Sequence, residues 1–222
     1  MSIKNQLADM FSEKYQLKAA DAGEYSKMSK NGMNFLISAF DARRREGEGS
    51  FRVSFIELKA MLGLMAMETA IITSQDRDVP LFSFDLIRAF GKNTLLIEAD
   101  STQVGEAPQE LLKRGNALKA KYSDLTVYQT EKRWYDAIKY PMSVAVTGKG
   151  VKEKVTDIVG DYAGLFLDWM ESAPECEESI KTAATKAYVD RLLGEGGTST
   201  DQFNKLFGRE RTEGVFRFLF NV

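Results

Sequence analysis

Hydrophobic positions change their spacing twice along the chain. Over residues 3–20, Ile3, Leu7 and Phe11 recur at intervals of about four, which predicts a helix. From residue 33 to residue 100, short apolar runs alternate with turn residues, a pattern typical of strands. After residue 105 the spacing is mostly helical again.

The apolar runs predict about six strands, most of them consecutive. The first and last connections between residues 33 and 100 are short enough for hairpins, which favours antiparallel neighbours. Residues 59–67 fit either a longer strand or a helical turn. The expected strands cover residues 33–40, 51–58, 68–73, 81–90, 94–99 and 142–147.

Five helices are expected after residue 105. The first has Pro108 near its start, a position that suits proline. Consecutive strands with helices before and after them indicate an α+β fold. We therefore predict a three-layer α/β/α sandwich around a central, mostly antiparallel sheet, in a single domain over residues 1–222. The expected helices cover residues 107–122, 151–169, 178–193, 201–207 and 210–220.

Composition excludes several kinds of site. The 222 residues include no histidine and one cysteine, Cys176, so histidine-dependent nucleophiles, imidazole metal sites, thiolate clusters and disulfide frameworks are excluded. The 30 basic and 32 acidic residues give a net charge of −2, which argues against a general nucleic-acid binder. No apolar run is long enough for a membrane span, and residues 1–11 lack a signal-peptide core, so we expect a cytoplasmic protein.

Two carboxylates continue apolar strand faces. Strand alternation groups Glu57 with Phe51, Val53 and Phe55, and it places Asp85 among apolar neighbours in the run 81–87. A carboxyl group removed from water has a raised pKa and can deliver a proton at neutral pH. The alternative is structural: a backbone-bonded Asp85, and a Glu57 paired with an arginine.

Other patterns point less clearly to a site. The glycine-rich run 194–200 lacks the Gly-Lys-Ser/Thr ending of a phosphate loop and follows a helix, so a linker with a helix N-cap at Ser199 or Thr200 is the better interpretation. Residues 111–140 carry seven basic side chains and three acidic ones. That stretch fits either a solvated helix face or a surface that attracts an acidic partner.

Several motifs together resemble the ferredoxin-dependent bilin reductases, which reduce biliverdin to phycobilins or phytochromobilin, and to which red chlorophyll catabolite reductase is related. The most specific segment is Pro-Leu-Phe-Ser-Phe-Asp-Leu-Ile over residues 80–87. The other similar segments, in the same order as in the family, are Phe-Arg at 51–52 with Glu-Leu at 57–58, Ala-Asp at 99–100 with Gln103, Phe-Asn-Lys-Leu-Phe-Gly at 203–208 and Phe-Leu-Phe at 218–220.

The resemblance implies that a linear tetrapyrrole binds between the sheet and the C-terminal helices. Electrons would come one at a time from reduced ferredoxin as external donor, with no cofactor or metal bound by the enzyme itself. Asp85 would be the central catalytic proton donor, and Glu57 would serve a second protonation. Ferredoxin would dock on the basic stretch 111–140, and we expect no nucleic-acid partner and no membrane span.

The chain departs from the family at three positions. Thr69 stands where one branch has a histidine, and Ala145 stands where an arginine would bind a propionate. Asp201 is the nearest residue to the family's C-terminal aspartate. We expect Thr69, Ser83 and Asp201 to contact the substrate. The alternatives are a non-catalytic tetrapyrrole-binding or interaction protein on the same fold, and an unrelated α+β protein whose carboxylates are merely paired.

Overall fold

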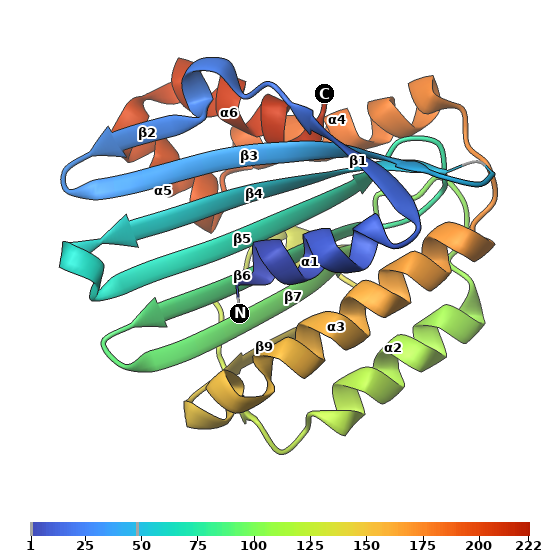
Figure 1. Cartoon of the computed structure of the whole chain (residues 1–222), viewed down its shortest axis with the longest axis horizontal. Coiled ribbons are helices and arrows are strands. Elements are labelled where there is room, and N and C mark those ends of the chain that lie inside the picture. Colours follow the sequence, from blue (N-terminus) through green and yellow to red (C-terminus); the bar gives the residue numbers. More distant parts are fainter. Residues whose placement is uncertain (1, 48) are drawn as a thin grey trace.

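The chain is built around one large antiparallel sheet (Figure 1). The computed structural model describes residues 2–47 and 49–222. Within those residues the sheet has nine strands. Eight pair in the order β1-β3-β4-β5-β6-β7-β9-β8, and the ninth, β2, pairs with the first part of β3, whereas β1 pairs with its last part. The strands are β1 Tyr15–Ala20, β2 Lys27–Lys30, β3 Met33–Arg44, β4 Ser50–Ala60, β5 Met65–Ser74, β6 Leu81–Ala89, β7 Lys92–Asp100, β8 Thr126–Val127 and β9 Val144–Thr147.

Helices lie on both faces of the sheet. In Figure 1, α1 and α3 cross the near face with α2 beside α3, whereas α4, α5 and α6 lie behind the strands. The first helix begins after Ser2, whose hydroxyl accepts a hydrogen bond from the backbone N–H of Asn5 at 3.1 Å. The helices are α1 Ile3–Ser12, α2 Gln109–Lys121, α3 Lys149–Ser172, α4 Glu178–Glu195, α5 Thr198–Phe207 and α6 Arg209–Phe220.

Strand alternation produces two separate hydrophobic clusters, one on each face. On β6, for example, Phe82 and Phe84 pack toward α1 and α3, whereas Leu81 packs toward the C-terminal helices. The α1–α3 cluster is rich in aromatic rings, with Phe166 at 5.1 Å from Phe51 between centroids. These two clusters fix which face each strand residue presents.

The α+β class and the mainly antiparallel sheet are confirmed, but the strand count of about six is too low. The helix predicted over residues 3–20 ends at Ser12, and β1 follows it. β1, β2 and β8 lie at the borders of the sheet, where they pair along one side only. Border strands bury few residues, so their hydrophobic pattern is weak.

Residues 59–67 turn out to combine both expected structures. β4 continues to Ala60, the single turn η2 follows over Met61–Gly63, and β5 starts at Met65.

Among the described residues, no helix is both long enough and apolar enough to cross a membrane.

Candidate functional site

Asp85 lies in a row of side chains that crosses the sheet. Strand register pairs it with Thr69 on β5 and with Leu96 on β7, so the three side chains share the face that carries α4–α6. Asp85 is the only ionisable residue in this row. In order from β3 to β9 the row contains Ile37, Ile56, Thr69, Asp85, Leu96 and Ala145.

Helices cover only part of this row. Ile37 and Ile56 lie under α5 and α6 and are 3% and 2% exposed. Asp85 and the residues farther along the row are partly exposed. Met67 and Ile87, which pair with each other in the neighbouring row on the same face, are also partly exposed. We call these partly exposed residues the open half-face. It consists of Met67, Asp85, Ile87, Leu96 and Ala145.

Segment 128–140 borders the open half-face. It begins beside β9, where the N–H of Tyr128 donates to the carbonyl of Ala145 at 2.8 Å, and it returns to β7, where the N–H of Tyr140 donates to the carbonyl of Ala99 at 2.8 Å. Between these points the single turn η3 (Trp134–Ala137) reaches the C-terminal helices, because Trp134 Nε1 donates to the carbonyl of Gly196 at 3.0 Å. The segment therefore joins the edge of the sheet to the α4–α5 turn.

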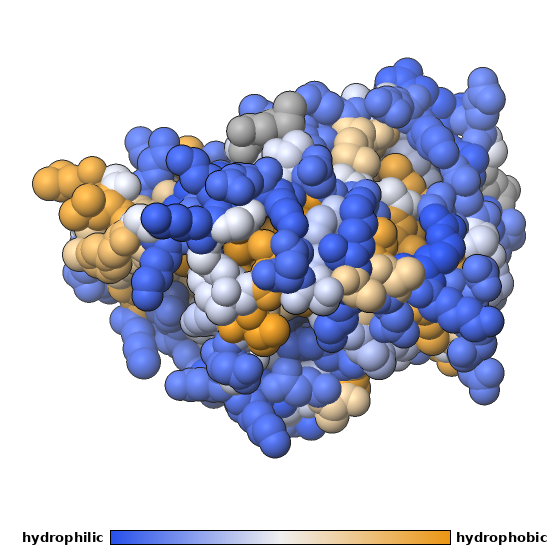
Figure 2. Space-filling model, turned by 90° about the horizontal axis from the view of Figure 1, so that it is seen from below, coloured by the Kyte–Doolittle hydropathy of each residue, from blue (hydrophilic) through white to orange (hydrophobic). Residues whose placement is uncertain are grey.

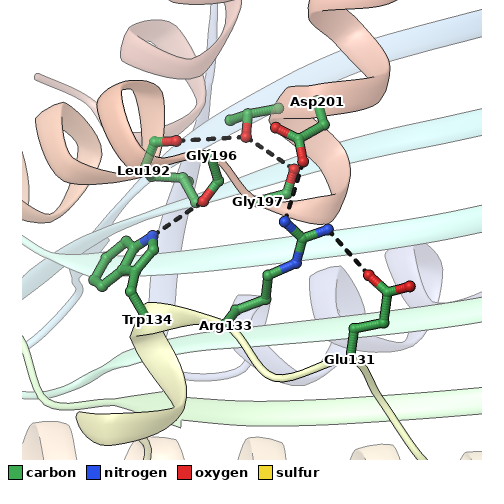
Figure 3. Close-up of polar contacts among 8 residues, drawn as sticks. Glu131, Arg133, Trp134, Leu192, Gly196, Gly197 and Asp201 are labelled. Atoms are coloured by element: carbon green, nitrogen blue, oxygen red, sulfur yellow. Dashed lines mark hydrogen bonds and ion pairs between the residues drawn. The ribbon is translucent and has the colours of Figure 1, made fainter.

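A cluster of polar contacts holds the segment against that turn (Figure 3). Arg133 pairs with Asp201 at 3.2 Å and with Glu131 at 3.4 Å. The guanidinium of Arg191 lies 4.3 Å from the centroid of the Trp134 ring, within reach of a cation–π contact. These contacts fix the position of segment 128–140, and none of them involves Asp85.

The glycines of the α4–α5 turn serve close packing. Gly196 has a φ of +85°, and a Cβ at Gly197 would lie 2.7 Å from Leu192 Cδ1. The helix starts at Thr198 with Gly197 as its N-cap, so the expected cap at Ser199 or Thr200 is wrong. The Thr200 hydroxyl instead donates to the carbonyl of Gly197 at 3.0 Å.

Asp85 is an isolated carboxyl group with a perturbed pKa. Its pKa is raised to about 7. Burial against the sheet is the largest cause, the hydrogen bond from the Thr69 hydroxyl to Asp85 Oδ1 opposes it, and nearby Glu98 adds to the rise. No arginine or lysine among the described residues forms an ion pair with Asp85. A structural ion pair therefore does not explain this carboxyl.

A second carboxyl with a raised pKa lies two rows away on the same face. Asp100 is 1% exposed, and its burial, followed by the effect of Glu98, raises its pKa to about 7. The Tyr188 hydroxyl on α4 donates to Asp100 Oδ2 at 2.9 Å. Between the two aspartates lies Glu98, which binds Lys139 Nζ at 2.6 Å.

Glu57 does not join Asp85. Alternation on β4 turns Glu57 toward α1, and Asp85 faces the opposite side of the sheet. Lys4 binds Glu57 Oε1 at 2.9 Å, so Glu57 has the structural pairing that the alternative interpretation allowed, although with a lysine instead of an arginine. Arg52 pairs with Asp41 at 2.8 Å. The two carboxylates that the sequence suggested therefore form no common site.

The three expected substrate contacts all lie on the Asp85 face. Thr69 is 7% exposed and donates its hydroxyl hydrogen bond to Asp85. Ser83 occupies the neighbouring row between Ile71 and Glu98 and is partly exposed. Asp201, near the start of α5, forms an ion pair with Arg133 of segment 128–140.

Ala145 lies in the same row as Asp85, at the edge of the open half-face. Alanine offers no charge at this position. The predicted basic surface is also largely neutralised within the chain. Its paired members are Arg114 with Asp168, Lys121 with Asp161 at 2.7 Å, Arg133 with Asp201, and Lys139 with Glu98.

Sequence reasoning missed Glu98, Asp100 and Tyr188 as neighbours of the site. Parity on strand 94–99 could have placed Glu98 with Leu96, opposite Leu95 and Ile97. Tyr188 could not be found in this way, because its contact with Asp100 spans 88 residues and depends on how α4 packs.

Among the described residues, no cluster of three or more acidic or cysteine side chains could hold a metal ion. No protein-family model matches the chain, and no curated protein is significantly similar to it. The resemblance to bilin reductases therefore rests on the sequence segments alone.

Proposed function

We propose that the chain is a bilin-reductase-like oxidoreductase that reduces a linear tetrapyrrole, with Asp85 as the proton donor. The proposal includes the finer fold assignment, a three-layer α/β/α arrangement with the pigment between the sheet and the C-terminal helices. The observation that carries it is the placement of Asp85 as the only ionisable side chain in a partly exposed, mostly apolar row of the sheet.

The open half-face suits a flat, conjugated ligand. Met67, Ile87 and Leu96 present apolar groups around Asp85 and remain partly exposed. Ligand sites in proteins are mainly apolar with a few placed polar groups. A pyrrole ring on the open half-face would meet the Asp85 carboxyl group amid hydrocarbon, while Glu98 in the neighbouring row is paired with Lys139. The Asp85 carboxyl would both orient the ring and supply a proton.

The chemistry requires two electrons and two protons for each double bond reduced. Electrons arrive one at a time from reduced ferredoxin and are taken up by the pigment. Asp85 then transfers a proton to the reduced pigment. A pKa of about 7 leaves a large protonated fraction of Asp85 at neutral pH, which general-acid catalysis needs. Solvent returns a proton to the aspartate and supplies the second proton.

A second candidate function is a tetrapyrrole carrier without turnover. Two observations favour it: Ala145 offers no charge for a propionate, and Glu57 lies on the other face of the sheet. Both proposals require pigment binding on the open half-face.

Visible spectroscopy separates these possibilities. The protein is mixed with biliverdin under anaerobic conditions, and spectra are recorded before and after addition of reduced ferredoxin. A shifted pigment spectrum on mixing, followed by loss of the biliverdin band with ferredoxin, is the expected result. A shift without reduction supports the carrier, and no shift on mixing removes both proposals.

A further inference from the structure

Four large hydrophobic side chains are exposed at two neighbouring turns of the sheet. Met61, Leu62 and Leu64, at η2, are 53%, 107% and 61% exposed, and Phe90, in the β6–β7 turn, is 69% exposed. The two turns are joined by a hydrogen bond from the N–H of Phe90 to the carbonyl of Leu64 at 3.2 Å. We call these four residues the apolar tip. Figure 2 shows hydrophobic groups projecting at the left end of the molecule, where Figure 1 places both turns.

The backbone of the tip adopts conformations that bulky residues disfavour. Met61, Leu62 and Phe90 have φ values of 51°, 54° and 49°, in the left-handed region. A glycine, which adopts positive φ at lower cost, follows each of them within two residues. These glycines, Gly63 and Gly91, also have positive φ values. Strained backbone of this kind concentrates at functional sites. Here it displays hydrophobic side chains that make little contact with the rest of the chain.

The charges around the tip are positive. Lys30, Lys59 and Lys92 are exposed beside the three hairpin turns at this end and form no ion pair among the described residues. No acidic residue occurs in the sequence segments 58–67 and 86–97. The carboxylates that flank these two segments are engaged elsewhere: Glu57 with Lys4, Glu68 with Arg88 and Glu98 with Lys139, while Asp85 accepts a hydrogen bond from Thr69.

We propose that the apolar tip inserts into the surface of an anionic lipid bilayer, with the three lysines contacting the headgroups. Apolar side chains beside lysines are the combination that holds proteins at membrane interfaces, where each lysine near an anionic surface adds to binding. A second copy of the chain fits less well, because a stable dimer interface needs about 20 to 30 residues on each side. The inference does not rest on the proposed reduction.

Vesicle flotation tests the proposal. The full chain is mixed with vesicles of phosphatidylcholine and phosphatidylserine, or with vesicles of phosphatidylcholine alone. The wild type is expected to float with the anionic vesicles, less with the neutral ones, and less again as salt screens the lysines. Absence of the wild type from the anionic vesicle fraction would overturn the proposal.

Leu62→Gly provides a variant that keeps the fold, because glycine suits the left-handed backbone and the leucine side chain is fully exposed. Its affinity for anionic vesicles should fall roughly tenfold, as expected for one inserted leucine. Lys92→Ala should lower it roughly fivefold. Val104→Gly removes a 59% exposed valine beyond the other end of β7 and should leave binding unchanged.

Two results would contradict the assignment. One is equal vesicle binding by Leu62→Gly and the wild type. The other is a wild-type dimer, seen by sedimentation velocity, that Leu62→Gly dissociates, because that outcome would identify a second copy as the occupant of the tip.

Discussion

Asp85 is governed by two opposing local effects. Burial against the sheet disfavours its charged form, whereas the hydroxyl of Thr69 donates a hydrogen bond that favours it. Both partners lie on one register row, so the hydrogen bond is set by strand pairing and not by a loop. This arrangement holds the pKa near neutrality and fixes the carboxyl group in place.

Thr69→Val tests this balance directly. Valine has a similar volume and no hydroxyl, so the pKa of Asp85 should rise further. If Asp85 is the proton donor, the alkaline limb of the pH–rate profile for biliverdin reduction should move to higher pH. Thr69→Ser, which keeps the hydroxyl, is the matched control. An unchanged alkaline limb in Thr69→Val would show that Asp85 does not set that limb.

At the scale of elements, a buried lysine ties α4 to the segments just before β6 and just after β7. Lys181 is 1% exposed, and its Nζ donates to the carbonyls of Val79 at 2.6 Å and Thr102 at 2.9 Å. Burial lowers its pKa to about 8. The same helix carries Tyr188, which contacts Asp100 beside the open half-face. Lys181 therefore positions a wall of the candidate site.

Lys181→Met should destabilise the fold by about 1–3 kcal/mol, because two buried carbonyl groups lose their donor. Lys186→Met on the same helix removes only an exposed ion pair with Asp190 and should cost less than about 1 kcal/mol. Chemical denaturation of both variants measures the difference. Equal unfolding free energies for the two variants would show that the Lys181 hydrogen bonds contribute little.

The elements differ in how well the sequence predicted them. Central strands such as β4 and β6 were found because β4 is buried on both faces for most of its length, β6 is buried on one face, and both runs contain phenylalanines. β1 was assigned to a helix because Tyr15 continues the four-residue spacing of Ile3, Leu7 and Phe11. β8 has only two residues and lies at the edge of the sheet, too short for any pattern.

At the scale of the whole molecule, strand parity predicted the surroundings of Asp85 correctly but not the pairing of the two carboxylates. Parity groups residues within one strand, and it does not state which face of β4 matches which face of β6. The register across β5 shows which faces match. It places Glu57 on one face of the sheet and Asp85 on the other. The border at 128–140 was also beyond prediction, since it depends on contacts such as that between Trp134 and Gly196.

The two perturbed aspartates also affect stability across the entire fold. Asp100 has a folded pKa of about 7, above the value of about 3.9 expected when unfolded. Between these values the folded state binds more protons than the unfolded state, so the free energy of unfolding falls as pH rises from 4 to 7. Asp85 acts in the same direction.

Asp100→Asn removes one of these two contributions while keeping an oxygen for Tyr188. Relative to the wild type, the variant should become steadily more stable as pH rises from 4 to 7, by at most about 1.4 kcal/mol per pH unit. Urea denaturation at a series of pH values measures this. Parallel stability curves for the two proteins would mean that Asp100 does not titrate in that range.

The central claim is that Asp85 transfers a proton to a pigment on the open half-face. The most direct measurement compares single-turnover reduction of biliverdin by wild type, Asp85→Asn and Glu57→Gln with excess reduced ferredoxin. We expect all three proteins to bind the pigment and Glu57→Gln to reduce it like the wild type, because Glu57 faces α1. Asp85→Asn should bind biliverdin but form product at least about a hundredfold more slowly. Product formation by Asp85→Asn at the wild-type rate would contradict the account.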